Sequence, residues 1–394
     1  MLTFNPGSSS VKLGVFTVED GRPQLIGRAS VSMGPRTSAL RIDDADRAID
    51  LPAAGDALPA FHTQIDPIAR HLFRHFAIDR LRAVAHRVVH GGDRFTGPTL
   101  IDATVRAGIE ALAPLAPLHQ PQSLRNITAV RHLWPDLPQV ASFDTAFHRT
   151  QSDRVRRFAL PRVLFDDGIK RYGFHGLSFQ SIAGQLQERH PALHAGRVVV
   201  AHLGSGASVC GLVGGESRDT SMAFSTLDGV PMATRPGAVD PGVLLYLQKE
   251  RGMTLDALED MLYHRSGLLG LSGISGDARV LAASAAPEAR EALASMTLRI
   301  AREIAAIATT LGGLDAIVFT GGIGEHQPDI RNAICLHLGW LGVQADPLAP
   351  AVPPARIDVA GSKVPLLVLH TDEEQVLAEE ACQVHPHPPS GTPR

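Results

Sequence analysis

The sequence contains few cysteines and few aromatic residues. Its three cysteines, Cys210, Cys335 and Cys382, are widely spaced and odd in number, which excludes a disulfide framework and a zinc-ligand spacing. No apolar run is long enough to span a bilayer, and polar residues 5–10 interrupt any signal-like start. We therefore expect a cytoplasmic protein with no membrane partner.

The chain also lacks an excess of charge of either sign. Its formal net charge is −3, so it has no general basic surface of the kind that binds nucleic acid. Its 394 residues, 44% of them hydrophobic, are enough for two domains with full cores. Any anion must be bound by small local groups of arginine.

Two glycine- and serine-rich turns stand in matching contexts almost two hundred residues apart. The first covers residues 5–10, the second covers residues 204–208, and each lies between two apolar runs. Glycine allows the close backbone approach that lets amides point at an oxyanion, and serine adds small donors. The pair predicts a duplicated fold that grips a polyphosphate from both sides.

Apolar runs alternate with helical patterns, which indicates a mixed α/β architecture. We expect strands at 83–89, 139–143, 198–203 and 316–319, and a helix over 287–311. Residues 34–60 should form an irregular excursion or short edge strands. Thr371 and Glu374 have the spacing of a helix capping box. The tail 385–394 should be disordered, and a domain boundary fits best near 145–155.

Several polar residues follow the expected strands or lie in loops. Asp144 ends a strand, where it could bind a metal or cap the next helix. Arg87 and Arg235 could each bind a carboxylate or phosphate, or form a surface ion pair. His175 lies between glycines, where a lone histidine is usually structural. A third glycine turn, residues 319–325, follows a strand and could hold an anion or a flat base.

Together these segments resemble the acetate/propionate kinase family, within the superfamily of sugar kinases, actin and heat-shock chaperones. The resemblance covers nearly the whole chain in the same order. It is carried by Asn5 to Lys12, His86 to Gly92, Pro117 to His119, Phe143 to His148, Arg171 to Gly176, Val200 to Gly204, Asp219 to Met222, Ser266 to Gly270, Gly322 to Glu325 and Thr371 to Glu374.

The resemblance implies two duplicated ribonuclease-H-like domains that flank an interdomain cleft. Residues 1–146 with a C-terminal helix, 377–394, would form the substrate side. Residues 147–376 would bind the nucleotide and form a homodimer. The implied reaction is the reversible, Mg²⁺- or Mn²⁺-dependent transfer of the ATP γ-phosphate to acetate, which gives acetyl phosphate and ADP.

The resemblance also implies a role for each matching residue. The catalytic group would be Asn5, Arg87, Asp144, His175 and Arg235, with Asn5, Asp144 and Glu373 at the metal. The substrate methyl would lie among Val89, Leu118, Phe174 and Pro231, beside Arg87. The nucleotide would contact Ser8, Ser10, Lys12, His202, Gly204, Ser205, Gly206, Asp277, Ala278, Arg279, Gly322, Ile323 and Gly324.

Elementary chemistry agrees with these roles. A carboxylate is already ionised at pH 7, so this nucleophile needs no general base. The negative charge of the carboxylate is repelled by the phosphates of ATP, and two arginines with Mg²⁺ can screen this repulsion.

Some positions depart from the family pattern. Ser205, Gln120 and Ser123 stand where the family generally has Asn, Ala233 stands where Gly is common, and His326 replaces Asn.

Three alternatives stay open at this point. The acid could be propionate or another short acid, because one methylene in an apolar pocket changes preference by only ~1–3 kcal/mol. Pyrophosphate could replace ATP as the phosphoryl partner. The chain could instead be a non-catalytic, actin-like module that closes on ATP, although such a module needs no pair of arginines for a carboxylate.

Overall fold

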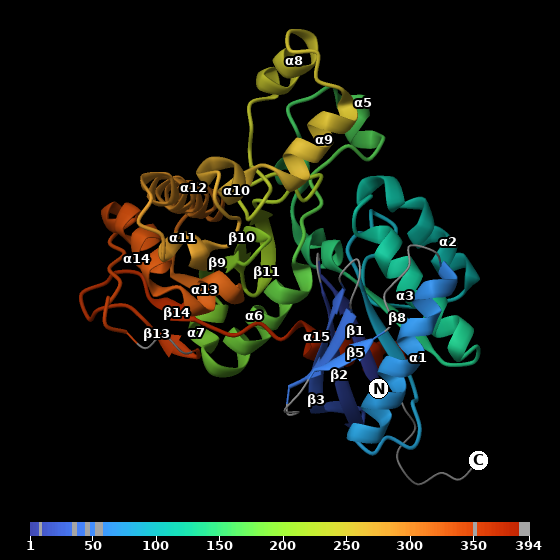
Figure 1. The fold of residues 1–394 in the computed structure, drawn as a ribbon. Coiled ribbons are helices and arrows are strands. Elements are labelled where there is room, and N and C mark those ends of the chain that lie inside the picture. Colours follow the sequence, from blue (N-terminus) through green and yellow to red (C-terminus); the bar gives the residue numbers. More distant parts are fainter. Residues whose placement is uncertain (8–9, 34–37, 44–47, 52–57, 350–352, 386–394) are drawn as a thin grey trace. The chain divides into compact units, whose positions relative to one another are not determined.

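The computed structural model describes residues 1–7, 10–33, 38–43, 48–51, 58–349 and 353–385. Ser8 and the predicted tail beyond His385 lie outside these residues. The chain forms two compact units. The first contains residues 1–147 and 372–394, and the second contains residues 148–371. Each is built around one mixed β-sheet (Figure 1).

The sheet of the first unit has the strand order β5-β4-β3-β2-β1-β6-β8-β7. Strands β3, β2 and β1 are antiparallel neighbours, whereas β1, β6 and β8 run parallel. The strands are β1 Leu2–Pro6, β2 Ser10–Glu19, β3 Arg22–Met33, β4 Ser38–Ile42, β5 Ile49–Leu51, β6 Val84–Val88, β7 Thr99–Leu100 and β8 Gln139–Phe143. The helices are α1 Leu58–His75, α2 Ala103–Ala111, α3 Gln120–Leu133 and α15 Glu373–Val384, with 3₁₀ turns η1 Ala113–Leu115 and η2 Asp144–Thr150.

The sheet of the second unit has the order β11-β10-β9-β12-β14-β13. Its strands are β9 Arg197–Leu203, β10 Ala207–Val213, β11 Glu216–Thr220, β12 Ala316–Thr320, β13 Ala355–Arg356 and β14 Leu366–Val368. Its helices are α4 Asp153–Arg156, α5 Arg162–Asp166, α6 Gly176–Arg189, α7 Pro191–His194, α8 Pro241–Lys249, α9 Leu255–His264, α10 Gly267–Ser272, α11 Ala278–Ala282, α12 Pro287–Leu311, α13 Gly321–His326 and α14 Pro328–His337, with the 3₁₀ turn η3 Gly339–Leu341.

The two sheets repeat one topology. In each, an antiparallel trio (β3-β2-β1 or β11-β10-β9) continues into a parallel trio (β1-β6-β8 or β9-β12-β14). Both predicted glycine turns join the first two strands of their repeat, β1 to β2 and β9 to β10. The expected duplication is therefore confirmed by strand order.

Strand alternation places site residues on one face of the first sheet. Leu2 and Phe4 of β1 pack into a core with Ile65 of α1 and Ala129 of α3. Successive side chains of a strand point to opposite faces, so Asn5 lies on the other face, where α15 packs. The apolar face of β1 therefore stabilises the strand that presents Asn5.

The expected strands and the long helix were predicted correctly, to within a residue or two. Helix α12 begins at Pro287 and ends at Gly312, whose φ of 72° is the left-handed conformation that favours glycine. Its residues Met296, Ile300 and Ile304 are buried, as their shared face predicts. None of the described helices is long and apolar enough to cross a membrane.

Of two further predictions about local structure, one was incomplete and one was wrong. Within residues 34–60, the alternative of short edge strands is confirmed by β4 and β5, which lie at one edge of the first sheet. The start of α1 in this range was not predicted, and its buried Ile65, Ile68 and Leu72 follow helical spacing. The cap of α15 is Asp372, which accepts a hydrogen bond from the Gln375 amide, and not Thr371.

The boundary of the C-terminal segment also differs from the prediction. The chain was expected to return to the first domain at residue 377, but Asp372 already belongs to the first unit. The reason is that α15 packs against β1, β2, β3, β6 and β8 as one helix from Glu373 onward.

Candidate functional site

A charged cluster lies at the ends of two parallel strands in the first unit. Arg87 is on β6 and Asp144 directly follows β8, its neighbour in the sheet. The guanidinium donates from Nε to Asp144 Oδ1 at 2.9 Å and from Nη2 to Oδ2 at 2.6 Å. Burial opposes ionisation, but Asp144 and Glu373 raise the pKa of Arg87 above its ordinary value. The arginine is thus a permanently charged group held in one orientation.

Asn5 joins this cluster to α15. Its Nδ2 donates to Glu373 Oε2 and to Glu374 Oε1, both at 2.8 Å, while its Oδ1 accepts from Arg87 Nη1 at 3.2 Å. Burial and the neighbouring Glu373 raise the pKa of Glu374. Lys12 pairs with Asn5 across β1 and β2. Glu374 was predicted to cap its helix, and its contact with Asn5 could not be inferred from that spacing.

The residues of this cluster fit a divalent cation of the Mg²⁺ type. Asp144, Glu373 and Glu374 bring three carboxyl groups around the single guanidinium of Arg87, and Asn5 adds an amide oxygen. Mg²⁺ usually keeps several waters and uses one or two carboxylates with substrate phosphates. Within the described part of the chain, no three acidic, histidine or cysteine side chains converge as a complete metal-ligand set.

In the second unit, the turn from β9 to β10 lies against Arg235 and His175. A Cβ atom at Gly206 would lie 2.7 Å from Arg235 Nη2 and 3.3 Å from His175 Nε2. Only glycine therefore lets these two polar groups approach the backbone of the turn. The turn itself is closed by a hydrogen bond from the Gly204 amide to the Gly206 carbonyl, at 3.0 Å.

His175 is held in an uncommon conformation. Its φ of 56° and ψ of 26° are left-handed, at the position just before α6. Its Nδ1 lies 2.8 Å from Ser208 Oγ, and its ring stacks on His202 with centroids 4.5 Å apart. His202 Nδ1 in turn lies 2.8 Å from Ser178 Oγ. A left-handed backbone in a residue other than glycine costs energy and often occurs at functional sites.

Arg235 is a largely buried cation. Its Nη1 donates to the Thr226 carbonyl at 2.9 Å. Among the residues that the structure describes, no aspartate or glutamate lies within ion-pair distance of it. Burial lowers the pKa of Arg235 to about 10, still well above neutral pH. A buried charge without a counter-ion is costly, so this position suits an anion supplied from outside.

The loop that carries Arg235 is fixed through its backbone. The Met232 amide donates to the Arg235 carbonyl at 3.0 Å, and the Ala233 amide donates to the Ser205 carbonyl at 3.1 Å. Gly267, with a φ of 61°, would place a Cβ atom 2.2 Å from the Met232 carbonyl oxygen. From the sequence, residues 232–237 could be recognised as a loop only by their composition. In the structure, the hydrogen bond from Ala233 to Ser205 connects this loop to the glycine turn.

A cavity of about 550 Å³ lies beside the same turn. Most of the residues predicted to contact the nucleotide line it. The lining consists of Gly204, Ser205, Ala233, Gly276, Asp277, Ala278, Arg279, Gly322, Ile323, His326 and Gln327. The predicted residues His202, Gly206 and Gly324 are not part of this lining, nor are Ser10 and Lys12 of the first unit. Ser8 lies outside the described residues. Arg279 donates from Nη2 to Asp277 Oδ2 at 2.6 Å, which places one ion pair in the wall of the cavity.

The glycine turn after β12 leads into helix α13, and hydrogen bonds from side chains stabilise both ends of this helix. The Glu325 carboxylate accepts from the Gly321 amide at 3.0 Å. The buried Arg331 donates from Nη1 to the Gly324 and Glu325 carbonyls, both at 2.9 Å. Arg331 was not singled out from the sequence, because an arginine within a helix pattern ordinarily suggests a solvated face.

The residues expected around the substrate methyl differ in burial. Val89, Phe174 and Pro231 are buried, whereas Leu118 is 43% exposed in the turn before α3. Val89 and Leu118 belong to the first unit, and Phe174 and Pro231 to the second. Ser10 begins β2, and its carbonyl accepts from the Gly7 amide at 2.7 Å.

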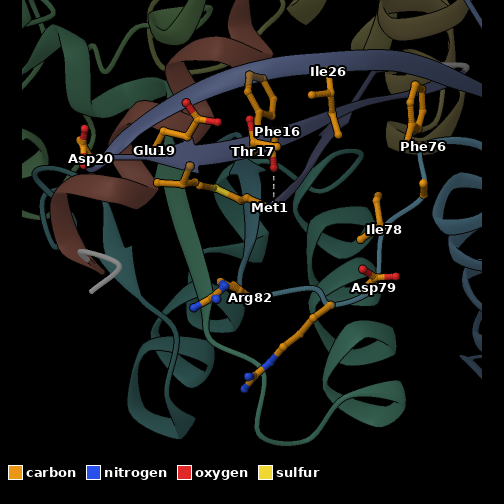
Figure 2. Close-up of a pocket in the computed structure, with 13 residues that line it drawn as sticks. Met1, Phe16, Thr17, Glu19, Asp20, Ile26, Phe76, Ile78, Asp79 and Arg82 are labelled. Atoms are coloured by element: carbon orange, nitrogen blue, oxygen red, sulfur yellow. Dashed lines mark hydrogen bonds between the residues drawn. The ribbon is translucent and has the colours of Figure 1, made fainter. Parts of the chain in front are cut away.

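A second cavity, of about 560 Å³, lies elsewhere in the first unit. Figure 2 shows its lining, which includes Met1, Phe16, Ile26, Phe76 and Arg82. None of the residues predicted for the site lines it. The chemistry suggested by the sequence therefore does not involve this cavity.

Comparison with known proteins agrees with this geometry. A sequence profile of the acetokinase family matches residues 1–379. The chain belongs to the acetokinase family. It is 45% identical over 387 residues to an acetate kinase of Rhodopseudomonas palustris, covering 96% of both chains. It is also 45% identical over 384 residues to an acetate kinase of Rhizobium meliloti, again covering 96% of each.

Solved structures of this family have the same fold. The chain matches an acetate kinase of Porphyromonas gingivalis with a TM-score of 0.84 at 31% identity, covering 97% of this chain and 98% of that one. It matches a propionate kinase of Francisella tularensis with a TM-score of 0.86 at 33% identity, covering 96% and 98%. The predicted fold class, an α/β protein with two duplicated ribonuclease-H-like sheets, is thus confirmed.

Proposed function

We propose that this chain is an acetate kinase, which reversibly transfers the γ-phosphate of ATP to acetate and forms acetyl phosphate and ADP. The acetate kinases that it resembles over almost their full length support this proposal. The observation that carries it is Arg235, a partly buried guanidinium with no acidic partner among the described residues. Such a group suits a substrate that brings its own negative charge.

The proposed transfer is direct and in line. An acetate oxygen forms a bond to the γ-phosphorus while the bond from that phosphorus to the β–γ bridging oxygen breaks, and ADP leaves with the electron pair. No proton has to be removed, because acetate is ionised at neutral pH. The protein therefore contributes orientation and charge neutralisation.

Each charged residue has a proposed part in that neutralisation. Arg87, oriented by Asp144, would bind the acetate carboxylate, and Arg235 would neutralise the transferring phosphoryl group. His175, oriented by Ser208, would donate to a phosphoryl oxygen from Nε2, the ring nitrogen that faces the Gly206 turn. These groups are fixed before substrate arrives, which lowers the reorganisation needed during transfer.

Mg²⁺ would be held by Asp144 and Glu373, partly through water, with Asn5 beside them. When bound, it neutralises phosphate charge and orients the phosphates. Lys12 and Ser10, near the β1–β2 turn, would contact the phosphates from the same unit.

The nucleotide would occupy the cavity beside Gly204 and Ser205. Its lining includes the small residues Ala278 and Gly322, which leave room for a flat base. The second unit, residues 148–371, would then bind the nucleotide, while the first unit would bind the acid.

The apolar residues beside Arg87 would decide which short acid is preferred. In the first unit, Val89 and Leu118 would contact its methyl group. A propionate kinase is among the similar solved structures, so propionate is the second candidate. A difference of one methylene is worth only ~1–3 kcal/mol in such a pocket.

A homodimer and a cytoplasmic location complete the proposal. Helix α8 has no buried residue, and its apolar side chains Val243, Leu245 and Tyr246 are each about half exposed. An apolar helix face of this kind suits a second copy of the chain. The three cysteines are buried free thiols, which suits a reducing compartment.

The central experiment measures acetyl phosphate formation with ATP, Mg²⁺ and acetate. We expect turnover that falls at least ~100-fold in Arg87→Ala and in Arg235→Ala. Arg80→Ala is the matched control, because Arg80 is an exposed arginine in the lining of the other cavity. Tight ATP binding without acyl phosphate from acetate, propionate or butyrate would instead support the non-catalytic alternative.

A further inference from the structure

A buried glutamine side chain makes three hydrogen bonds beside the segment that follows β6. Gln120, at the start of α3, is fully buried. Its Oε1 accepts from the His90 amide at 3.2 Å, and its Nε2 donates to the His90 carbonyl at 2.9 Å. The same Nε2 donates to the carbonyl of Ile109 on α2 at 3.2 Å. One side-chain amide thus ties together the end of β6, α2 and α3.

Neighbouring side chains complete this anchoring. Ser123 Oγ donates to the Arg87 carbonyl at 3.1 Å, and Thr145 Oγ1 accepts from the Gly91 amide at 2.9 Å. The Gly92 amide donates to His90 Nδ1 at 3.0 Å, which requires a neutral ring. Burial lowers the pKa of His90 to about 4, so the ring is neutral at physiological pH.

These contacts surround two residues with proposed roles. The anchored residues are 90–92, and the buried Val89 directly precedes them, two residues after Arg87. Backbone that leaves a strand has no ladder partners, so its position depends on the side chains that satisfy its polar groups. The side chain of asparagine is one methylene shorter and could not span the His90 amide, the His90 carbonyl and Ile109 together.

We propose that Gln120 is a positioning residue that sets the acid selectivity of the site. By fixing the backbone at His90, it also fixes the position of the neighbouring Val89. The side chain of Val89 then cannot move away from the acid to make room for a longer one. This inference rests on the proposed function, since it assumes that Val89 faces the acid. It concerns a residue that contacts neither the nucleotide cavity nor the charged cluster.

The test combines amide hydrogen exchange with kinetics on the full chain. In Gln120→Met and Gln120→Asn we expect faster exchange at residues 90–92 in the ligand-free protein. The ratio of kcat/KM for acetate to that for propionate should fall about tenfold, while KM for ATP changes less than twofold. Gln122→Asn is the matched control on the same helix, and it should leave both measurements unchanged.

A second variant keeps the test decisive if Gln120→Met fails to fold. Thr145→Val removes the acceptor for the Gly91 amide and keeps the shape of the side chain, so it should lower the same ratio.

Two other outcomes separate this inference from the function on which it rests. Faster exchange with an unchanged acid ratio would overturn the selectivity role. If the unsubstituted chain showed no turnover, the proposed function and the selectivity role would both fail, and hydrogen exchange alone would decide whether Gln120 holds the segment.

Discussion

Arg87 and Asp144 form a two-point ion pair, with Nε–Oδ1 and Nη2–Oδ2 distances of 2.9 Å and 2.6 Å. The side chain of Asp144 is 1% exposed and that of Arg87 is 13% exposed. The pair connects β6 to the residue that follows β8, and it leaves Nη1 of the arginine directed at Asn5 and Pro6. The carboxylate orients the arginine and belongs to the proposed metal site.

Asp144→Asn should therefore lower the turnover and weaken the response to Mg²⁺ together. The amide keeps the size of the side chain but loses the charge, so we expect kcat to fall at least ~100-fold. The Mg²⁺ concentration for half-maximal rate should also rise, because one of the two proposed carboxylates is gone. Initial rates over a Mg²⁺ series measure both, with the exposed Asp136→Asn as control. An unaltered Mg²⁺ dependence would contradict the metal role.

Replacing Arg235 should separate activity from stability. In Arg235→Met, a buried cation without an acidic partner among the described residues becomes an apolar side chain of similar length. We expect turnover to be lost and the free energy of unfolding to stay level or rise by up to about 2 kcal/mol. Urea unfolding of the ligand-free protein measures this change. A marked loss of stability would show that Arg235 serves the fold.

The Gly206 turn should not tolerate a methyl group. In Gly206→Ala, the new Cβ would lie 2.7 Å from Arg235 Nη2, so the guanidinium must shift. We expect kcat to fall ~10- to 100-fold with little change in the far-ultraviolet circular dichroism spectrum. Gly184→Ala on α6 is the matched control, since its Cβ would meet nothing within 4 Å. Equal rates in both variants would exclude the turn from the reaction.

Three buried histidines should make the folded state sensitive to acid. Burial lowers the pKa of His86, His90 and His148 to about 4, below the ordinary 6.5. The unfolded chain binds these protons first, so stability is full above pH 6.5 and declines as the pH falls towards 4, by about 3 kcal/mol for each ring.

Urea unfolding between pH 7 and pH 4.5 tests this dependence. His148→Gln should reduce the slope of stability against pH by up to about 1.4 kcal/mol per pH unit. The same slope in the variant would mean that His148 is not buried in its neutral form.

The exposed face of α8 should determine the oligomeric state. Tyr246→Glu places a charge on a helix that buries no residue in its own unit, so we expect a dimer to become a monomer. Light scattering after gel filtration measures the mass. Trp340→Glu, at another exposed aromatic side chain, is the control and should remain dimeric. A monomeric unsubstituted chain would contradict the proposed interface.

The sequence alone determined the elements with strong local signals. Two glycine turns between apolar runs predicted the duplicated hairpins, and Pro287 with Gly312 predicted both ends of α12. The types of the charged residues, and their positions at strand ends, also indicated phosphoryl chemistry before any contact was known. These features follow from local backbone preferences and from the periodicity of apolar residues.

Only the tertiary structure decided what each polar side chain contacts. Asn5 and Glu373 are 368 residues apart and share a hydrogen bond, so no local pattern could join them. For the same reason, the sequence could not show that Gln120 anchors His90 or that Arg235 lacks an acidic partner among the described residues. Partners and burial are set when distant segments pack together, and this decides which charges remain available to a substrate.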